Sequence, residues 1–446
     1  MFELIFSDRL DPEHELMRAA NLIDWDGLHE RLERYYSHRG RSGKPIRMMV
    51  GIHILKHRYN CSDERAVEEL RENNYWQSFC GFTTFQTGDI VDATSLVKFR
   101  NRIGVKGMEL IEQTVTGAWC AQGFVKTKRV LVDTTSQPKN IGYPTDADLL
   151  HKVREKIVKK VKEVCREVAF RRPFRSFRRK GNQVLLQVKK LFRHKEQARQ
   201  EAIKAIKVMT ESVIRQSKKV VNSLYARGHN KLAQELNRLV SVGKKVIAQT
   251  EKVLAGENPA KRIYSLHEPK VAAIKKGKAH PSCEFGSIVS LAVNEDGVVV
   301  SHKEYQENVS DVKTLAPVIQ KVERTTGKRP QEAAADRGFD QSVEKQERMR
   351  KRLKLKRLSI PKKGKKPHPE SKQWWFKRGQ RRRARIEPVI GHLKNDHRLS
   401  RCRYRGSQGD TSNVVWATLA WNMKKITRLA HHKEEKQTLR GKKKTA

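Results

Sequence analysis

Acidic side chains are scarce in this sequence relative to basic ones. Lys and Arg number 95 against 49 Asp and Glu, which gives a net charge of +46 over 446 residues. The excess of positive charge runs through the whole chain. So many positive side chains repel one another unless a polyanion neutralises them. We therefore expect a nucleic acid as the partner. A basic protein of the ribosomal or chromatin type would carry the same charge, so charge alone does not predict an enzyme.

Long apolar runs and paired cysteines are absent as well. No run approaches the roughly 20 residues that span a bilayer, and the first residues, MFELIFSDRL, turn charged too early for a secretory signal. The six cysteines form no CxxC pair, and their spacing to the histidines matches no common zinc finger. These absences predict a cytoplasmic, nucleoid-associated protein with reduced thiols and no membrane contact.

Three short strings, far apart in the chain, each supply one candidate acid. They are LVDTTSQ (131–137) with Asp133, AADRGFD (334–340) with Asp336, and RRRARIEPVIGHLK (381–394) with Glu387. The apolar run just before Asp133 is typical of a buried strand that ends in a polar segment. Any one of these acids alone would more simply cap a turn or form a salt bridge. Because all three occur in this order, they favour one shared site.

Three carboxylates gathered in one place suit a pair of divalent cations. Mg²⁺ takes hard oxygen ligands and keeps water and substrate phosphates in its remaining positions. Two such ions activate a water or a 3′-hydroxyl and stabilise the leaving oxygen of a phosphodiester. Asp133, Asp336 and Glu387 are therefore predicted to be both the catalytic and the metal-binding residues. The predicted cofactor is two Mg²⁺ ions, replaceable by Mn²⁺.

The first part of the chain, residues 1–122, is predicted to be an all-α DNA-binding domain. Apolar residues at helical spacing in 45–56 indicate one helix. Ser62 and Asp92 are typical N-caps and predict the start of two more. Short helices with basic residues on the last of them fit a helix-turn-helix-like reader, and a plain helical scaffold is the alternative.

The remaining sequence divides into three further parts. Long amphipathic runs in 146–261 predict a helical, coiled-coil-like insertion, with turns at Gly181 and Gly228. Around it, residues 123–145 and 262–430 have the element order of a ribonuclease H-like α/β catalytic core, including a tight hairpin at Asn294-Glu295-Asp296-Gly297. Residues 431–446 are charged and predicted to be a disordered basic tail.

The segment around Glu387 indicates phosphate binding. Arg383 lies four residues before the acid and Lys394 seven after it, so an unbroken helix would place all three on one face. Two cations beside a metal-binding acid are well placed to hold the phosphates of a scissile strand. Pro388 predicts that the helix starts or kinks at the acid, which weakens the argument for Arg383 and leaves Lys394 unaffected. A solvated basic face is the alternative.

These strings resemble the DDE transposases of the insertion sequence five family. ELRENNYWQSFCGF (69–82) and SLVKFRNRIG (95–104) are similar to the N-terminal domain of that family, and CEFGSIVS (283–290) is similar to its second core strand. The resemblance implies a bacterial mobile element moved by cut-and-paste transposition. It further implies a homodimer on double-stranded DNA that recognises terminal inverted repeats and target DNA with Mg²⁺. Asp133, Asp336 and Glu387 would be the metal triad, and Arg383 and Lys394 would contact phosphates at the element's end.

Three further residues are expected to contact DNA. They are Arg337, beside Asp336, and the pair Trp374 and Trp375, which would stack on an unpaired base. Aromatic pairs are, however, more often part of a core. The sequence departs from the family at Gln380, where a tyrosine is usual, and in the position of its long insertion. Two alternatives stay open: a ribonuclease H-like nuclease without strand transfer, and a catalytically silent transposase-derived DNA-binding protein.

Overall fold

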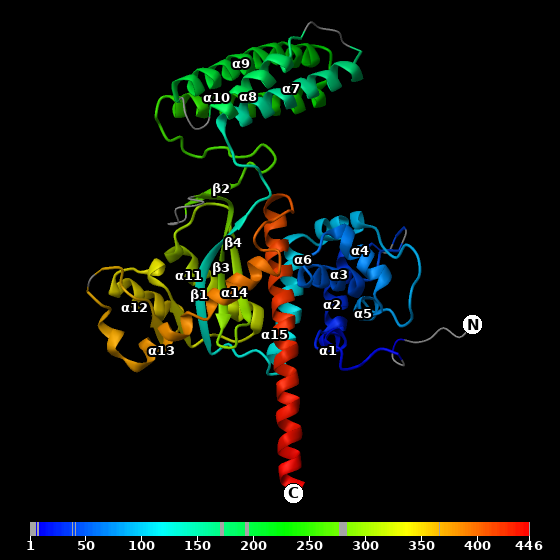
Figure 1. Cartoon of the computed structure of the whole chain (residues 1–446), viewed down its shortest axis with the longest axis vertical. Coiled ribbons are helices and arrows are strands. Elements are labelled where there is room, and N and C mark those ends of the chain that lie inside the picture. Colours follow the sequence, from blue (N-terminus) through cyan, green and yellow to red (C-terminus); the bar gives the residue numbers. More distant parts are fainter. Residues whose placement is uncertain are drawn as a thin grey trace. The chain divides into compact units, whose positions relative to one another are not determined.

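The computed structural model describes residues 6, 9–37, 39–40, 42–169, 174–191, 196–275, 283–364 and 366–445, and side chains up to residue 437. The chain forms two compact units (Figure 1). One comprises Met1–Asn140 and Ile274–Ala446, and the other is Ile141–Ala273. The expected insertion, 146–261, lies inside the second unit. Within the described residues, no helix is long and apolar enough to cross a membrane.

The first unit begins with a run of helices, several of which are started by a polar cap. They are α1 (Glu15–Asn21), α2 (Trp25–Leu32), η2 (Glu33–Tyr35), α3 (Ile46–Arg58), α4 (Asp63–Glu72), α5 (Asn74–Phe79) and α6 (Ala93–Ala121). Ser62 accepts a hydrogen bond from the backbone of Arg65, and Asp92 accepts one from Thr94. The helices predicted from 45–56, Ser62 and Asp92 are thereby confirmed.

A mixed sheet forms the centre of this unit. Its strands are β1 (Arg129–Pro138), β2 (Ala272–Lys275), β3 (Cys283–Asn294), β4 (Val299–Tyr305), β5 (Glu332–Ala335) and β6 (Arg357–Ser359). The order is β2-β3-β1-β5-β6, and β4 pairs with β3. β1 runs antiparallel to β3 and parallel to β5, and β6 runs parallel to β5. The predicted hairpin is confirmed, because Asn294 Oδ1 accepts hydrogen bonds from Asp296 and Val298 and Gly297 adopts φ 82°.

Helices cover both faces of the sheet. They are α11 (Asp311–Thr326), η3 (Arg337–Phe339), α12 (Val343–Arg352), η4 (Pro369–Lys372), α13 (Trp374–Arg383), α14 (Ile386–Asn395) and α15 (Gly406–Thr445). Val130 and Val132 of β1 join a core that includes α11 and α6, while Leu131 joins a second core with Ile386 and Val389 of α14. A strand buried on both faces explains the continuous apolar run in the sequence.

The N-terminal helices and the sheet share one core. The larger apolar cluster extends from Leu16 of α1 through Trp119 of α6 to Val132 of β1 and Trp416 of α15. α15 contacts α3 and α6 on one side and β4 on the other (Figure 1). Residue 122 is therefore not a boundary between compact units.

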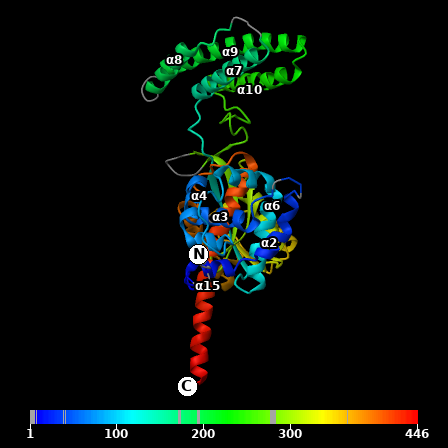
Figure 2. The same ribbon diagram turned by 90° about the vertical axis from the view of Figure 1, so that its right-hand side faces the viewer.

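The C-terminal segment differs from its prediction. Residues 431–446 were expected to form a disordered tail, but α15 continues to Thr445 and extends away from the rest of its unit (Figure 2). Two physical causes favour the helix. Glu435 lies one turn from His431 and His432 and contacts both, and Glu434 forms an ion pair with Arg18 of α1.

The second unit is a bundle of four described helices. They are α7 (Asp146–Glu167), α8 (Arg178–Lys190), α9 (Glu196–Ala226) and α10 (Asn230–Leu254). Its apolar clusters consist of residues of this unit alone. Gly228, with φ 77°, lies in the turn between α9 and α10, as predicted. The turn predicted at Gly181 is wrong, because Gly181 lies inside α8. A Cβ there would be 1.6 Å from the guanidinium of the fully buried Arg154, so this glycine makes room for that arginine.

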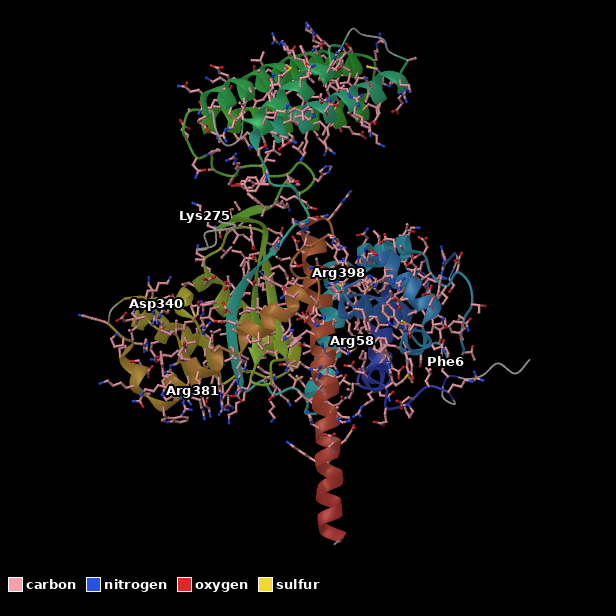
Figure 3. The ribbon with its side chains drawn as sticks, viewed as in Figure 1. Phe6, Arg58, Lys275, Asp340, Arg381 and Arg398 are labelled. Atoms are coloured by element: carbon pink, nitrogen blue, oxygen red, sulfur yellow. The ribbon has the colours of Figure 1, made fainter. Side chains whose placement is uncertain are left out.

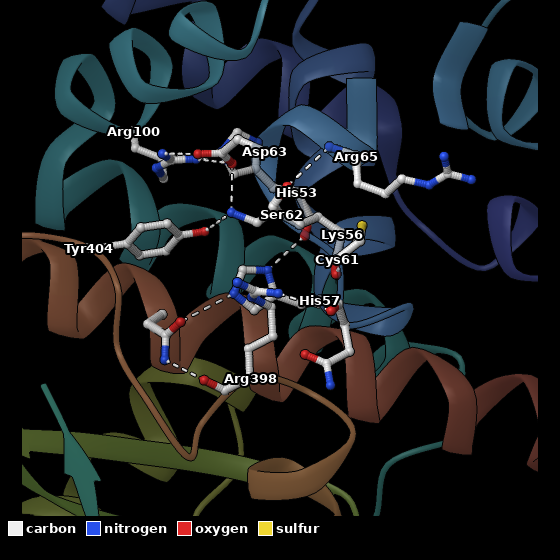
Figure 4. A network of polar contacts seen from close by, with 12 residues as sticks. His53, Lys56, His57, Cys61, Ser62, Asp63, Arg65, Arg100, Arg398 and Tyr404 are labelled. Atoms are coloured by element: carbon white, nitrogen blue, oxygen red, sulfur yellow. Dashed lines mark hydrogen bonds and ion pairs between the residues drawn. The ribbon is translucent and has the colours of Figure 1, made fainter. Parts of the chain in front are cut away.

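Two polar networks fix the N-terminal helices to the rest of the first unit. In one, Asp63 accepts hydrogen bonds from Arg100 and Lys56, and Lys56 also donates to the hydroxyl of Tyr404 (Figure 4). In the other, Glu112 of α6 pairs with His302 of β4 at 3.0 Å and with Lys321 of α11 at 2.7 Å. Burial alone would raise the pKa of Glu112, but the charges of His302 and Lys321 lower it to about 2. Although burial opposes it, Glu112 raises the pKa of His302.

We predict that Glu112→Gln lowers the free energy of unfolding by about 3 kcal/mol, because it removes the acid that pairs with both buried cations, His302 and Lys321, and leaves Glu304 beside His302. The loss is largest between the ordinary pKa values of 4.5 for Glu112 and 6.5 for His302. Below this window Glu112 becomes protonated as the pH falls towards its lowered pKa. Above it His302 loses its proton as the pH passes its raised pKa. Urea denaturation at several pH values measures the difference.

Glu109→Gln is the matched control. This acid lies on the exposed side of the same helix, so its loss should change stability by no more than about 0.5 kcal/mol. Equal effects of the two substitutions, or a Glu112→Gln effect that does not vary with pH, would contradict the role given to the buried network.

Candidate active site

The register of the sheet brings Asp133 and Asp336 side by side. The last pair between β1 and β5 joins Val132 to Ala335, so the two acids occupy the next positions on neighbouring parallel strands. Such strands lie about 4.8 Å apart. Asp336 Oδ1 accepts a hydrogen bond from the backbone of Gly338 at 2.8 Å, which starts the turn η3. Asp133 Oδ1 accepts one from the backbone of Thr134 at 2.7 Å.

Positive charge at this pair of acids is too weak to keep the pKa of Asp133 at its ordinary value. Burial raises the pKa of Asp133 to about 6, and the neighbouring charges of Asp336 and Asp311 act in the same direction. The hydrogen bond from Thr134 and the charge of Arg383 oppose the shift without cancelling it. Like charges held this close favour either a proton or a bound cation.

A fourth acid, Asp311, belongs to the same cluster and was missed in the sequence. It is the first residue of α11, and its Oδ1 accepts a hydrogen bond from the hydroxyl of Thr134 at 2.7 Å. A Cβ on Gly338 would lie 2.6 Å from Asp311 Oδ2 and 2.8 Å from Asp336 Oδ1. In the sequence, Asp311 is recognisable only as an acid at the start of a helix, because it lies in none of the three strings that contain Asp133, Asp336 and Glu387.

Glu387 is connected to Asp133 by Arg383, which contacts both acids. One guanidinium nitrogen of Arg383 is 3.0 Å from Glu387 Oε1 and another is 3.6 Å from Asp133 Oδ2. The side chain of Glu387 is 64% exposed. In the part of the chain that the structure describes, the one group of three ligand atoms within 4.8 Å of one another is His431, His432 and Glu435, on the surface of α15. The ligand atoms of Asp133, Asp336 and Glu387 therefore do not all lie within 4.8 Å of one another, and Arg383 bridges Asp133 and Glu387.

The helix that carries Glu387 begins where Pro388 predicts. α13 ends at Arg383 and α14 starts at Ile386, so Pro388 is the third residue of α14 and its missing N–H costs no hydrogen bond. Arg383 therefore belongs to a different helix from Glu387 and still contacts it. Lys394, at the other end of α14, donates to the hydroxyl of Ser136 on β1 at 3.4 Å.

The remaining predicted DNA contacts lie at the surface around η3 and α13. Arg337 is exposed, and so is Arg381 at the end of α13 (Figure 3). Trp374 is 57% exposed, and the guanidinium carbons of Arg357 and Arg378 lie 4.7 and 4.5 Å from its ring centre. Trp375 is less exposed and contacts the ring of Phe376. Both tryptophans already have protein partners.

Gln380, the departure from the family pattern, has a structural role. Its amide donates to the carbonyl oxygen of Ser359 at 2.8 Å and to that of Ala335 at 3.2 Å. It therefore ties α13 to the ends of β5 and β6, beside Asp336. The tyrosine usual in the family is replaced here by a side chain that fixes the helix carrying Arg383.

The mixed sheet, with acids just beyond the last β1–β5 pair, fits the ribonuclease H-like fold predicted from the sequence. Comparison with known proteins agrees. The Transposase domain (DUF772) matches residues 4–102, and the Transposase DDE domain matches residues 258–423. An uncharacterized protein, ORF8 in the nfe locus of Rhizobium meliloti, is 40% identical over 166 residues, which are 36% of this chain and 80% of that protein. No solved structure matches.

The chain belongs to the DDE transposases, which confirms the resemblance to the insertion sequence five family. Its process is accordingly the transposition of DNA, and DDE transposase domains use divalent metal ions. Asp133, Asp336 and Asp311 supply carboxylate oxygens of the kind that such an ion takes, and a cation beside Asp133 would oppose the burial and the like charges that raise its pKa.

We predict that Gly338→Ala lowers the free energy of unfolding by about 1–3 kcal/mol, because the added methyl group would force apart the carboxylates of Asp311 and Asp336. Chemical denaturation measures the loss. Gly391→Ala in α14 is the control, because no atom lies within 4 Å of its Cβ position. Because alanine has the better helix propensity, Gly391→Ala should raise the free energy of unfolding by up to about 1 kcal/mol. A harmless Gly338→Ala would show that the two acids are not held close.

Proposed function

We propose that this transposase moves DNA by a cut-and-paste reaction. It would hydrolyse phosphodiesters at the inverted-repeat ends of a mobile element and then join the freed 3′-hydroxyl to target DNA. The observation that carries the proposal is the register that sets Asp133 beside Asp336, with Glu387 linked to Asp133 through Arg383. A protein that only binds DNA has no need for buried acids that repel each other.

Asp133, Asp336 and Glu387 are the proposed holders of two divalent cations, with Mg²⁺ as the natural ion and Mn²⁺ as a substitute. Bound there, the ions would activate the attacking oxygen and stabilise the leaving one. The protein contributes the placement. The pairing of β1 with β5 fixes Asp133 and Asp336 in the sheet. Asp311 accepts a hydrogen bond from the hydroxyl of Thr134, the residue next to Asp133. In this arrangement Asp311 positions a neighbour of the acids.

Arg383 has two possible kinds of partner, and we propose that it changes between them. In the structure it neutralises Asp133 and Glu387. A guanidinium binds phosphate as well as carboxylate, through the same planar set of donors. When the acids bind their cations, Arg383 would therefore leave the acids and bind phosphate oxygens of the DNA end. Glu387, exposed and on a separate helix from Arg383, is free of packing restraints that would oppose this change.

The DNA partners are proposed from the basic residues around these acids. Lys394 lies in the last turn of α14, beside Ser136 of β1, and we propose that it contacts the DNA backbone at the element's end. Arg337 would contact the same DNA. Trp374, flanked by two arginines, would present its remaining surface to a base, and Trp375, the next residue of α13, would contact the same DNA with its exposed part. We further propose a homodimer, with one chain acting at each end.

We predict that Asp133→Asn abolishes strand cleavage in Mg²⁺ and leaves binding to the element's end nearly unchanged. The amide keeps the shape of the side chain and loses the charge that holds a cation. Cleavage of a labelled duplex, with binding measured by fluorescence anisotropy, separates the two effects, and EDTA should reproduce the loss of cleavage in the unaltered protein. Glu323→Gln, on an exposed part of α11, is the control and should cleave normally. An equal loss of cleavage and binding would mean that Asp133 is structural.

We predict that Lys394→Ala weakens end binding and lowers the slope of log affinity against log salt by about one, because one phosphate contact is lost. Anisotropy titrations at several salt concentrations give the slope. Lys377→Ala, on the exposed side of α13, removes the same charge away from α14. An unchanged slope for Lys394→Ala, or the same change in both variants, would reject the phosphate contact.

A further inference from the structure

The helical bundle has far more basic residues than its acids can neutralise. Residues 141–273 contain 32 Lys and Arg against 12 Asp and Glu. Even if every acid paired with one base, 20 positive charges would remain in this unit. The acids of the catalytic cluster all lie outside it. The charge of the bundle therefore needs an explanation of its own.

The acids of the bundle are already used within it. Eight of the twelve form ion pairs with bases of the same unit: Asp146, Asp148, Glu155, Glu163, Glu196, Glu211, Glu235 and Glu251. Internal pairing thus holds the helices together without reducing the excess. The surplus lies on side chains that project from the helices into solvent, and Figure 3 shows such side chains along the whole bundle.

One face of the bundle gathers surplus charges on α9 and α10. These helices pack closely, since a Cβ on Gly243 would be 2.8 Å from Ile214. Arg215 and Lys218 are exposed one turn apart on α9, and Lys244 is exposed on α10. No acid pairs with any of these three among the residues that the structure describes.

Lys218 lies one turn after Ile214 on α9 and Lys244 follows Gly243 on α10, so the close packing of Ile214 and Gly243 brings the two ammonium groups near each other. The nearness of Lys218 lowers the pKa of Lys244. Two ammonium groups in contact are unfavourable unless an anion lies between them. The face formed by Arg215, Lys218 and Lys244 is therefore complementary to a row of negative charges, and we call it the α9/α10 face.

We propose that the helical bundle is a second DNA-binding unit, separate from the active site, whose α9/α10 face holds the phosphate backbone of duplex DNA. Lysines act as point charges on phosphates and read no base sequence, so binding by this face does not depend on sequence. Self-association is the competing use of an exposed helical face. It would bring two surfaces with the same excess of positive charge together, which the charge opposes.

The test uses the full chain and a short duplex of arbitrary sequence, in EDTA. Cleavage cannot occur under these conditions, so the result does not depend on whether the three acids perform chemistry. Lys218→Gln with Lys244→Gln should lower the slope of log affinity against log salt by about two, because each lysine releases close to one counterion on binding. Circular dichroism confirms that the bundle remains helical in the variant.

Lys159→Gln with Lys189→Gln is the matched control. It removes the same charge from the same unit, but these lysines already pair with Glu163 and Asp148. The control should change the slope by much less than two. An unchanged slope for the Lys218 and Lys244 variant, or the same change in both variants, would overturn the proposal. A changed oligomeric state in sedimentation with an unchanged slope would assign the face to self-association instead.

Discussion

The position of β1, buried on both faces and paired on both edges, is the constraint on which the site depends. Antiparallel pairing with β3 and parallel pairing with β5 fix its register, and alternate residues enter the two cores. A slip of one residue would exchange those faces. Asp133 lies on the same face of β1 as Leu131, because side chains alternate along a strand, and Leu131 packs against α14. The apolar residues of β1 thus aim its acid towards the helix that carries Glu387.

Charge is the second organising feature. In a chain with nearly twice as many bases as acids, most acids find a basic partner. The network around Asp63 joins helices to one another, and that around Glu112 joins α6 to the sheet through His302. The cluster of Asp133, Asp336 and Asp311 is different, because it leaves acids facing acids and raises the pKa of Asp133. Arg383 compensates only part of that repulsion. The bundle presents the opposite case, with bases facing bases.

The sequence predicted features that depend on local patterns. Caps at Ser62 and Asp92, the hairpin at Gly297 and the break at Pro388 follow from short-range chemistry and were confirmed. Features that depend on tertiary contacts were missed. Gly181 signals a turn in the sequence but makes room for Arg154, and the charged C-terminal segment is helical because Glu434 pairs with Arg18. Asp311 and Gln380 acquire their roles only from strands distant in sequence.

The most direct test of the account is where metal binds when a cut DNA end is present. Anomalous scattering from Mn²⁺ in crystals of the full chain with such DNA would locate the ions. The account predicts ions bound by Asp133 and Asp336, with Glu387 as a further ligand and Arg383 moved from the acids to a phosphate. Ions bound elsewhere, with Arg383 still between Asp133 and Glu387 on bound DNA, would contradict it.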